Sequence, residues 1–329
     1  MHDIAAIVDS LGGITQKKQL VARGARDLDL TRAVRDGAVT RARQGWYTTL
    51  PESDRRVRAI RVGGRLTGIS AVIQAGGWVL GEHPLHVAVP ANAARLRSQE
   101  NRRVRFDTSK PGGVVLHWDA IEVGERGPVS SVGLSDALYR VVLNESLETA
   151  VAALDWALRT QALDQIDFEQ LLLRLPQDCR PIGNWVDGAC DSLPESLVRT
   201  RLRLRGHVVV SQVTRGDAKH IDLVVDDCVA VEADGEEHHA HRFDHDRRKD
   251  IHITIERLHV IRPTALMIFY EWDLVLLAIE TAISERHPDR AIGNSGYDPS
   301  RRLNNPGFLP RPQKRRRPSP EFPKPRRRR

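Results

Sequence analysis

The sequence has few of the features that typify secreted or membrane proteins. Only three of its 329 residues are cysteine, and no pair has a C-x-x-C spacing, which argues against a disulfide framework or a thiolate zinc site. The most apolar stretch, residues 265–283, contains three carboxylates and is therefore not expected to span a bilayer. The first residues carry no basic segment ahead of an apolar run, so no signal peptide is expected. We expect a cytoplasmic protein with no membrane partner.

Aromatic residues are also scarce, at 5%, but 40% of the chain is hydrophobic and 28% is charged, which is an ordinary balance for a globular protein. The net charge of +7 is unevenly distributed: residues 1–126 carry +7, residues 127–298 carry −11 and residues 299–329 carry +11. The last segment also holds eight prolines. We expect a disordered basic tail at residues 298–329 that can bind nucleic acid without sequence preference.

Residues 1–50 predict a winged helix-turn-helix. The expected elements are helices at residues 4–11, 16–23 (capped by Thr15) and 28–35, and a hairpin of residues 38–43 and 46–49. The DNA-binding candidates would be three residues on the third helix and two on the wing: Thr31, Arg32, Arg35, Arg41 and Arg43. The alternative is a small helical domain with solvated arginines.

Residues 55–190 predict a mixed α/β middle region with a helical second half. The expected helices cover residues 67–75, 135–143, 147–158 and 168–175, and the expected strands cover residues 85–89, 104–106 and 114–118. No catalytic constellation is visible in this region, which indicates a scaffold.

Residues 192–287 predict a domain with the element order α-β-β-β-α-β-α. This domain is of the α/β class, and the whole chain is expected to be α+β. The expected elements are a helix at 193–205, strands at 207–213, 220–225 and 228–234, a helix at 243–257, a strand at 259–262 and a helix at 271–285.

Three carboxylates fall on two of these strands: Asp222 on one, and Glu232 and Asp234 on the next. Carboxylates gathered in one place repel one another unless a cation lies between them, and Mg2+ prefers such oxygen ligands. Asp222 lies opposite Glu232 only if the loop between the strands has an odd number of residues, such as residues 226–228. A two-residue turn at 226–227 would put the two carboxylates on opposite faces of the sheet.

Two further sets of residues have more than one interpretation. Five histidines lie between residues 220 and 245, and His238 or His239 could act as a proton donor or base, bind zinc, or lie in a solvated polar loop. Glu195 follows Ser192 by three residues, which is the spacing of a helix capping box. A cap and a metal ligand are both open roles for Glu195.

Residues 192–280 resemble the Vsr-like branch of the PD-(D/E)XK nuclease superfamily, relatives of the very-short-patch repair endonuclease. The resemblance rests on an ordered set of segments: 192–195 (SLPE), Gln212, 221–223 (IDL), 231–235 (VEADG), 238–239 (HH) and 243–248 (FDHDRR). It implies a Mg2+ or Mn2+ site formed by Glu195, Asp222 and Glu232, with Asp234 and a histidine, His239, assisting catalysis. Asp234 stands where the family motif usually has lysine.

Residues 4–50 resemble the N-terminal winged helix of AbiEi-type antitoxins of type IV toxin–antitoxin systems. The matching residues are 13–15 (GIT), Leu20, Gly24, Gly37, 39–41 (VTR) and 45–47 (GWY). The C-terminal domain of those antitoxins is not recognisable here. The resemblance implies DNA as a partner, and a toxin or another product of the same operon as a second candidate partner.

Two hypotheses follow. The first is a metal-dependent DNA endonuclease or nickase. The second is a non-catalytic, antitoxin-like transcriptional regulator whose nuclease fold is degenerate. The three carboxylates Asp222, Glu232 and Asp234 favour the first hypothesis, and the missing lysine favours the second.

Overall fold

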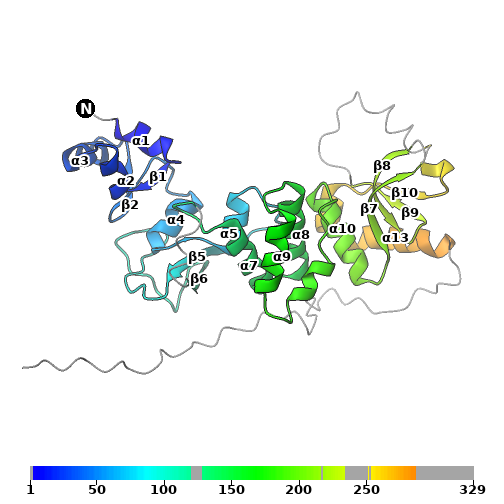
Figure 1. Cartoon of the computed structure of the whole chain (residues 1–329). Helices are drawn as coiled ribbons and strands as arrows, with labels where there is room; N and C mark the ends of the chain where they lie inside the picture. Colours follow the sequence, from blue (N-terminus) through cyan, green and yellow to red (C-terminus); the bar gives the residue numbers. More distant parts are fainter. Residues whose placement is uncertain (1–2, 120–127, 216–217, 234–250, 252, 287–329) are drawn as a thin grey trace, which may run out of the picture.

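The computed structural model describes residues 3–119, 128–215, 218–233, 251 and 253–286. Within these residues the protein is a mixed α/β structure with small separate sheets, as the sequence predicts in outline (Figure 1). The basic tail lies outside the described residues, as does most of the helix predicted at residues 243–257.

The N-terminal part contains three helices and a three-stranded antiparallel sheet in the order β1-β3-β2. Its elements are α1 (Ile4–Ser10), β1 (Ile14–Gln16), α2 (Lys17–Ala22), α3 (Asp27–Arg35), β2 (Thr40–Arg43) and β3 (Trp46–Thr48). Asp3 caps α1 by accepting a hydrogen bond from Ala6 N at 3.0 Å. The prediction that Thr15 caps the second helix is wrong: Thr15 lies in β1, where it pairs with Tyr47, and Gln16 is the N-cap of α2.

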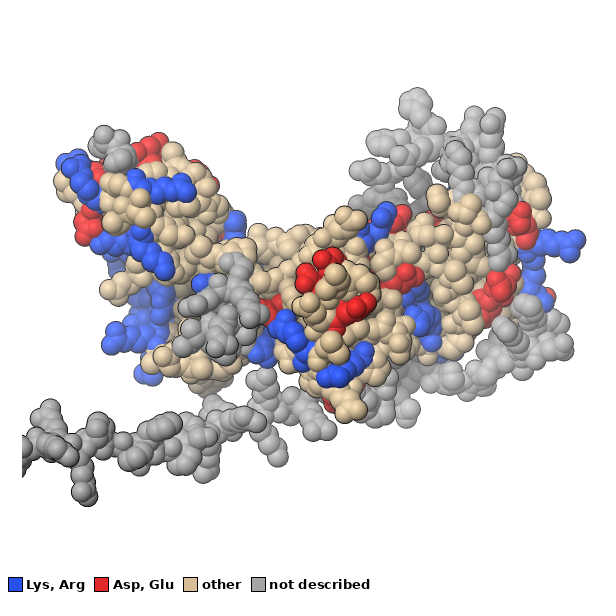
Figure 2. Space-filling view, in the orientation of Figure 1, with Lys and Arg blue, Asp and Glu red and all other residues tan. Residues whose placement is uncertain are grey.

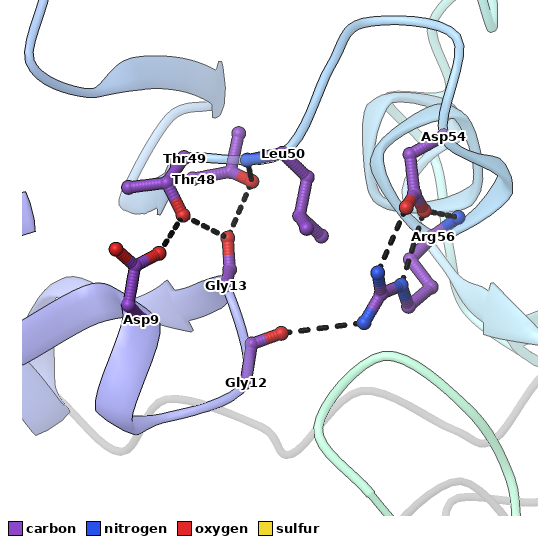
Figure 3. Close-up of polar contacts among 8 residues, drawn as sticks. All are labelled: Asp9, Gly12, Gly13, Thr48, Thr49, Leu50, Asp54 and Arg56. Carbon is purple, nitrogen blue, oxygen red and sulfur yellow. Dashed lines mark hydrogen bonds and ion pairs between the residues drawn. The ribbon is translucent and has the colours of Figure 1, made fainter.

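A further helix, α4 (Arg55–Val62), packs against this sheet and was not predicted. Figure 3 shows how its start is tied to the N-terminal part. The Arg56 guanidinium pairs with Asp54 at 2.8 Å and donates to Gly12 O at 3.3 Å. Nearby, the Thr48 hydroxyl donates to Gly13 O at 2.6 Å. The arginines of α4 obscured its pattern in the sequence, although Val57 and Ile60 are buried.

The middle region contains a three-stranded sheet, order β4-β5-β6, in which β5 and β6 are parallel, together with a group of helices. Its remaining elements are β4 (Arg65–Leu66), α5 (Gly68–Gln74), β5 (Leu85–Pro90), β6 (Val114–Asp119), α7 (Leu134–Asn144), α8 (Leu147–Arg159), α9 (Gln165–Arg174) and the 3-10 helix η1 (Arg180–Asn184). The strand predicted at residues 104–106 is wrong: only an isolated bridge between Arg97 and Arg105 forms there.

The C-terminal part contains a four-stranded sheet in the order β10-β9-β8-β7. Its elements are α10 (Leu193–Leu204), β7 (Val209–Arg215), β8 (Ala218–Val225), β9 (Val229–Val231), β10 (His259–Ile261), α12 (Ala265–Tyr270) and α13 (Trp272–Arg286). Leu197, Leu223, Val231 and Ile279 belong to one core, in which α10 and α13 pack on the sheet. Because α10 begins at this core, its first turn lies close to the sheet.

Buried polar contacts join α8 of the middle region to α10. Asp155, which is fully buried, accepts hydrogen bonds from Arg199 Nη2 at 2.7 Å, Ser196 Oγ at 2.6 Å and Asp187 N at 2.7 Å. Arg199 also donates to Trp185 O at 2.6 Å. Ser196 and Arg199 follow Glu195 on α10, so this contact fixes the helix that carries Glu195.

Candidate functional site

The hairpin of β8 and β9 has the register on which the predicted carboxylate site depends. Leu223 pairs with Val231 and Val225 pairs with Val229, so three residues, 226–228, form the loop. Continuing this register by one position puts Asp222 opposite Glu232. Asp226 and Asp227 both have a positive φ, at 47° and 57°, and Cys228 N donates to Val225 O at 3.0 Å to close the turn.

Asp222 and Glu232 are held at the end of β9 by backbone hydrogen bonds. Asp222 Oδ2 accepts from Ala233 N at 2.9 Å, which ties the Asp222 carboxylate to the residue that follows Glu232. Glu232 N donates to Ile261 O at 3.0 Å, so Glu232 continues the pairing of β9 with β10. The Glu232 side chain is buried, at 5% exposed.

Glu195 approaches this end of the sheet from the first turn of α10. Its carboxylate accepts hydrogen bonds from Asp191 N at 2.9 Å, Ser192 Oγ at 2.7 Å and Gln212 Nε2 at 2.9 Å. Glu195 N donates in turn to Ser192 Oγ at 3.4 Å. The capping role is therefore present, in a form in which Glu195 bonds to the Ser192 hydroxyl and to Asp191 N.

The electrostatics of Glu195 connect it to Asp222. Burial raises the pKa of Glu195, because an apolar environment disfavours the charged carboxylate. The hydrogen bonds that Glu195 accepts lower its pKa, and the negative charge of Asp222 raises it. Asp222 is thus close enough to Glu195 for its charge to act on Glu195, and a cation beside them would make Glu195 easier to ionise.

The contact between Gln212 and Glu195 was not predicted by the strand pattern. Gln212 has a left-handed φ of 51°, and the regular pairing of β7 with β8 includes its neighbours Ser211 and Val213 but not Gln212 itself. Beside it the alternation of β8 is broken, since Ile221 and Leu223 pack in different cores. This irregularity lets Gln212 donate to Glu195. No feature of the sequence marks Gln212 for a left-handed conformation.

Two of the predicted catalytic residues, Asp234 and His239, lie outside the described residues. Within the part of the chain that the structure describes, no three His, Cys, Asp or Glu side chains come together closely enough to hold a metal ion. The structure therefore brings Glu195 and Asp222 close together and holds Glu232 directly after β9. Among the described residues, these three side chains do not form a complete set of metal ligands.

The candidates on α3 are exposed. Thr31, Arg32 and Arg35 all lie on the solvent side of this helix. The Thr31 hydroxyl donates to Asp27 O at 2.8 Å, within the helix, and Arg35 pairs with Asp36 at 3.1 Å on the surface. Exposed ion pairs of this kind contribute little to stability, so they leave the guanidinium accessible to another anion.

The two candidates on the hairpin differ from each other. Arg41 lies over the Tyr47 ring, 5.4 Å from its centroid, and keeps part of its surface exposed. Arg43 instead donates to Arg61 O at 2.8 Å, Val62 O at 2.9 Å and Arg95 O at 2.5 Å. Burial, and then the charge of Arg97, lower the pKa of Arg43. Arg43 thus links β2 to the end of α4 and to the segment at residue 95.

In comparisons with known proteins, no protein-family model matches the chain, and no curated protein is significantly similar to it. Among the helices of the described residues, none has both the length and the apolar character needed to cross a membrane.

Proposed function

We propose that this protein binds DNA and cuts it as a metal-dependent endonuclease or nickase of the Vsr-like PD-(D/E)XK type. The observation that carries the proposal is the register of β8 and β9, whose continuation by one position would set Asp222 opposite Glu232, together with the charge of Asp222 acting on Glu195 of α10. The element order α10, β7, β8, β9, β10, α13 supports the same assignment.

The residue types at this end of the sheet are those that a hard divalent cation such as Mg2+ or Mn2+ prefers, although the described carboxylates do not by themselves form a closed ligand set. Glu195, Asp222 and Glu232 offer carboxylate oxygens, and the charge of Asp222 raises the pKa of Glu195, an effect that such a cation would oppose. Asp234 is the further candidate ligand, and His239 the candidate proton donor or base. A bound Mg2+ would polarise the scissile phosphate and make a water more acidic. In this proposal Gln212 and Ser192 orient Glu195 through their hydrogen bonds.

The N-terminal part supports DNA binding. Its element order, α1, β1, α2, α3, β2, β3, suits a winged helix-turn-helix in which α3 would enter the major groove. Arg32 and Arg35 on α3 are exposed, and Arg41 lies on the β2 wing. In the proposed protein this domain would bind DNA and the C-terminal domain would cut it.

The proposal is tested by incubating supercoiled plasmid with the purified full chain and Mg2+ or Mn2+, with EDTA in a parallel reaction. We expect nicked or linear product with the metal and none with EDTA. Asp222→Asn keeps the side-chain size but removes a charge that the cation needs, so cleavage should fall by at least about a hundredfold while DNA affinity is unchanged. Glu169→Gln, which removes an exposed carboxylate on α9 of the middle region, is the control and should cut like the wild type.

A second candidate function is that of a non-catalytic, antitoxin-like regulator. It is favoured by the hydrogen bonds that already engage Glu195 and Asp222, and by Asp234 in the place of the family's lysine. A toxin or another product of the same operon would then be its partner. If wild-type protein binds DNA but shows no metal-dependent cleavage, the regulator explains the result and the endonuclease does not.

A further inference from the structure

An arginine-rich hairpin lies between β5 and β6 in the chain of the middle region. Ser98 N donates to Val104 O at 2.9 Å and Phe106 N donates to Leu96 O at 3.1 Å, so residues 96–106 fold back on themselves. The bridge between Arg97 and Arg105 lies between these two bonds. We call residues 95–105 the arginine hairpin.

The arginine hairpin has a strong excess of positive charge. It contains five arginines and one acidic residue, Glu100; the arginines are Arg95, Arg97, Arg102, Arg103 and Arg105. Three of the five are exposed and two are half-buried. None of them forms an ion pair with a carboxylate of the described chain. Figure 2 shows lysine and arginine side chains gathered on this side of the molecule, below the N-terminal part.

The pairing of Arg97 with Arg105 is unfavourable for an isolated protein. Directly opposed residues of an antiparallel pair have neighbouring side chains, and like charges in such positions repel. An anion lying between the two guanidinium groups would remove that repulsion, and a phosphate can accept hydrogen bonds from both. A phosphate bound at this pair would therefore offset the repulsion between the two arginines.

The arginine hairpin is fixed close to the β2 wing. Arg43 of β2 donates to Arg95 O, and Arg97 N donates to Val62 O at 3.1 Å at the end of α4. The buried Arg61 of α4 donates to Glu100 O at 3.1 Å. These contacts place the hairpin and the wing on adjoining surfaces, so a duplex that reaches the wing can reach the hairpin as well.

From these contacts we infer that the arginine hairpin is a second DNA-binding element, which grips the phosphate backbone of duplex DNA beside the winged helix. The inference rests on the DNA binding in the proposed function, and it is independent of cleavage. The hairpin would add affinity without reading base sequence, because guanidinium–phosphate contacts are the same for every sequence.

The test measures the affinity of the full chain for a fluorescent duplex by anisotropy, in EDTA, between about 50 and 200 mM salt. Arg97→Gln with Arg105→Gln, and separately Arg102→Gln with Arg103→Gln, remove two charges each. Each pair should reduce the slope of log affinity against log salt by between about one and two, since each phosphate contact contributes about 0.9. The loss should be equal for unrelated duplexes.

Three further variants serve as references. Arg97→Lys with Arg105→Lys keeps both charges and should retain most of the salt slope. Arg180→Gln with Arg286→Gln removes two exposed charges elsewhere and should bind like the wild type. Arg32→Ala with Arg35→Ala tests α3 and should weaken binding through the winged helix.

A separate measurement concerns stability without DNA. In low salt, Arg97→Gln alone should raise the midpoint temperature of thermal unfolding, because it ends the repulsion between Arg97 and Arg105.

The outcomes separate this inference from the proposed function. If the α3 variant weakens binding and neither hairpin pair changes the salt slope, the hairpin does not touch DNA and only this inference falls. If wild-type protein does not bind duplex at all, the DNA-binding part of the proposed function falls with it. If the hairpin pairs keep the wild-type salt slope but dissociate a wild-type oligomer in size-exclusion chromatography, the hairpin binds an acidic surface of a second copy, and the DNA assignment is overturned.

Discussion

At the scale of single residues, position in the fold determines which charged groups are available for function. Arg41 and Arg43 are two residues apart on one strand, but the three carbonyls that bind Arg43 make it a structural residue. Those carbonyls come from positions 18, 19 and 52 residues further along the chain. Such long-range partners leave no local pattern, which is why the sequence presents both arginines as equal DNA-binding candidates.

A buried pair of histidines makes a prediction about acid stability. His117 Nε2 lies 3.3 Å from His86 Nδ1, and His117 is 3% exposed. Burial, with the nearby charges of His86 and Arg140, lowers the pKa of His117 from 6.5 to about 3. Between those two pH values the unfolded chain binds a proton that the folded chain does not. The free energy of unfolding should therefore fall as pH drops below 6.5, by up to about 1.4 kcal/mol for each pH unit.

Urea denaturation at pH 7 and pH 5 checks this prediction. His117→Gln replaces the titrating ring with a neutral amide, so the variant should lose about 2 kcal/mol less stability than the wild type between the two pH values. His259→Gln, which replaces an exposed histidine, is the control and should follow the wild type. Equal losses in wild type and His117→Gln would show that His117 is protonated in the folded protein.

At the scale of elements, the sequence predicts the regular pieces better than their irregular joins. α10, β5 and β10 lie close to their predicted positions, because their apolar spacing or capping residues are local signals. The loop of β8 and β9 could be stated only as two alternatives. The three-residue form requires left-handed backbone at both Asp226 and Asp227, and an Asp-Asp pair is compatible with either loop length. The left-handed Gln212, which bonds to Glu195, had no local signal at all.

The join between α8 and α10 makes a prediction about stability. Asp155→Asn keeps much of the hydrogen bonding to Ser196 and Asp187 but leaves the buried Arg199 charge without its anion. Breaking a buried ion pair in this way should lower the free energy of unfolding by about 3–5 kcal/mol. Asp36→Asn, which breaks the exposed pair with Arg35, should lower it by less than about 1 kcal/mol. Chemical denaturation measures both, and a small effect of Asp155→Asn would mean that water reaches Arg199.

At the scale of the whole molecule, charge is divided in a way that suits the proposed function. The basic N-terminal 126 residues contain α3, β2 and the arginine hairpin, and the acidic residues 127–298 contain Glu195, Asp222 and Glu232. In the proposed function, the first region would attract DNA and the second would repel it, so a divalent cation would be needed to bring the DNA backbone against Glu195, Asp222 and Glu232. The overall distribution of charge was readable from the sequence, whereas the anchoring of the hairpin beside the wing required the fold.

The proposed function requires that Glu195, Asp222 and Glu232 bind one divalent cation when DNA is present. The most direct measurement is Mn2+ binding by electron paramagnetic resonance, with the full chain and a duplex carrying uncleavable phosphorothioate linkages. We predict one Mn2+ per chain in the wild type, and at least about a tenfold loss of Mn2+ affinity in Asp222→Asn and in Glu232→Gln, with Glu169→Gln unchanged. Absence of Mn2+ binding by the wild type, or equal binding by all the variants, would contradict the claim.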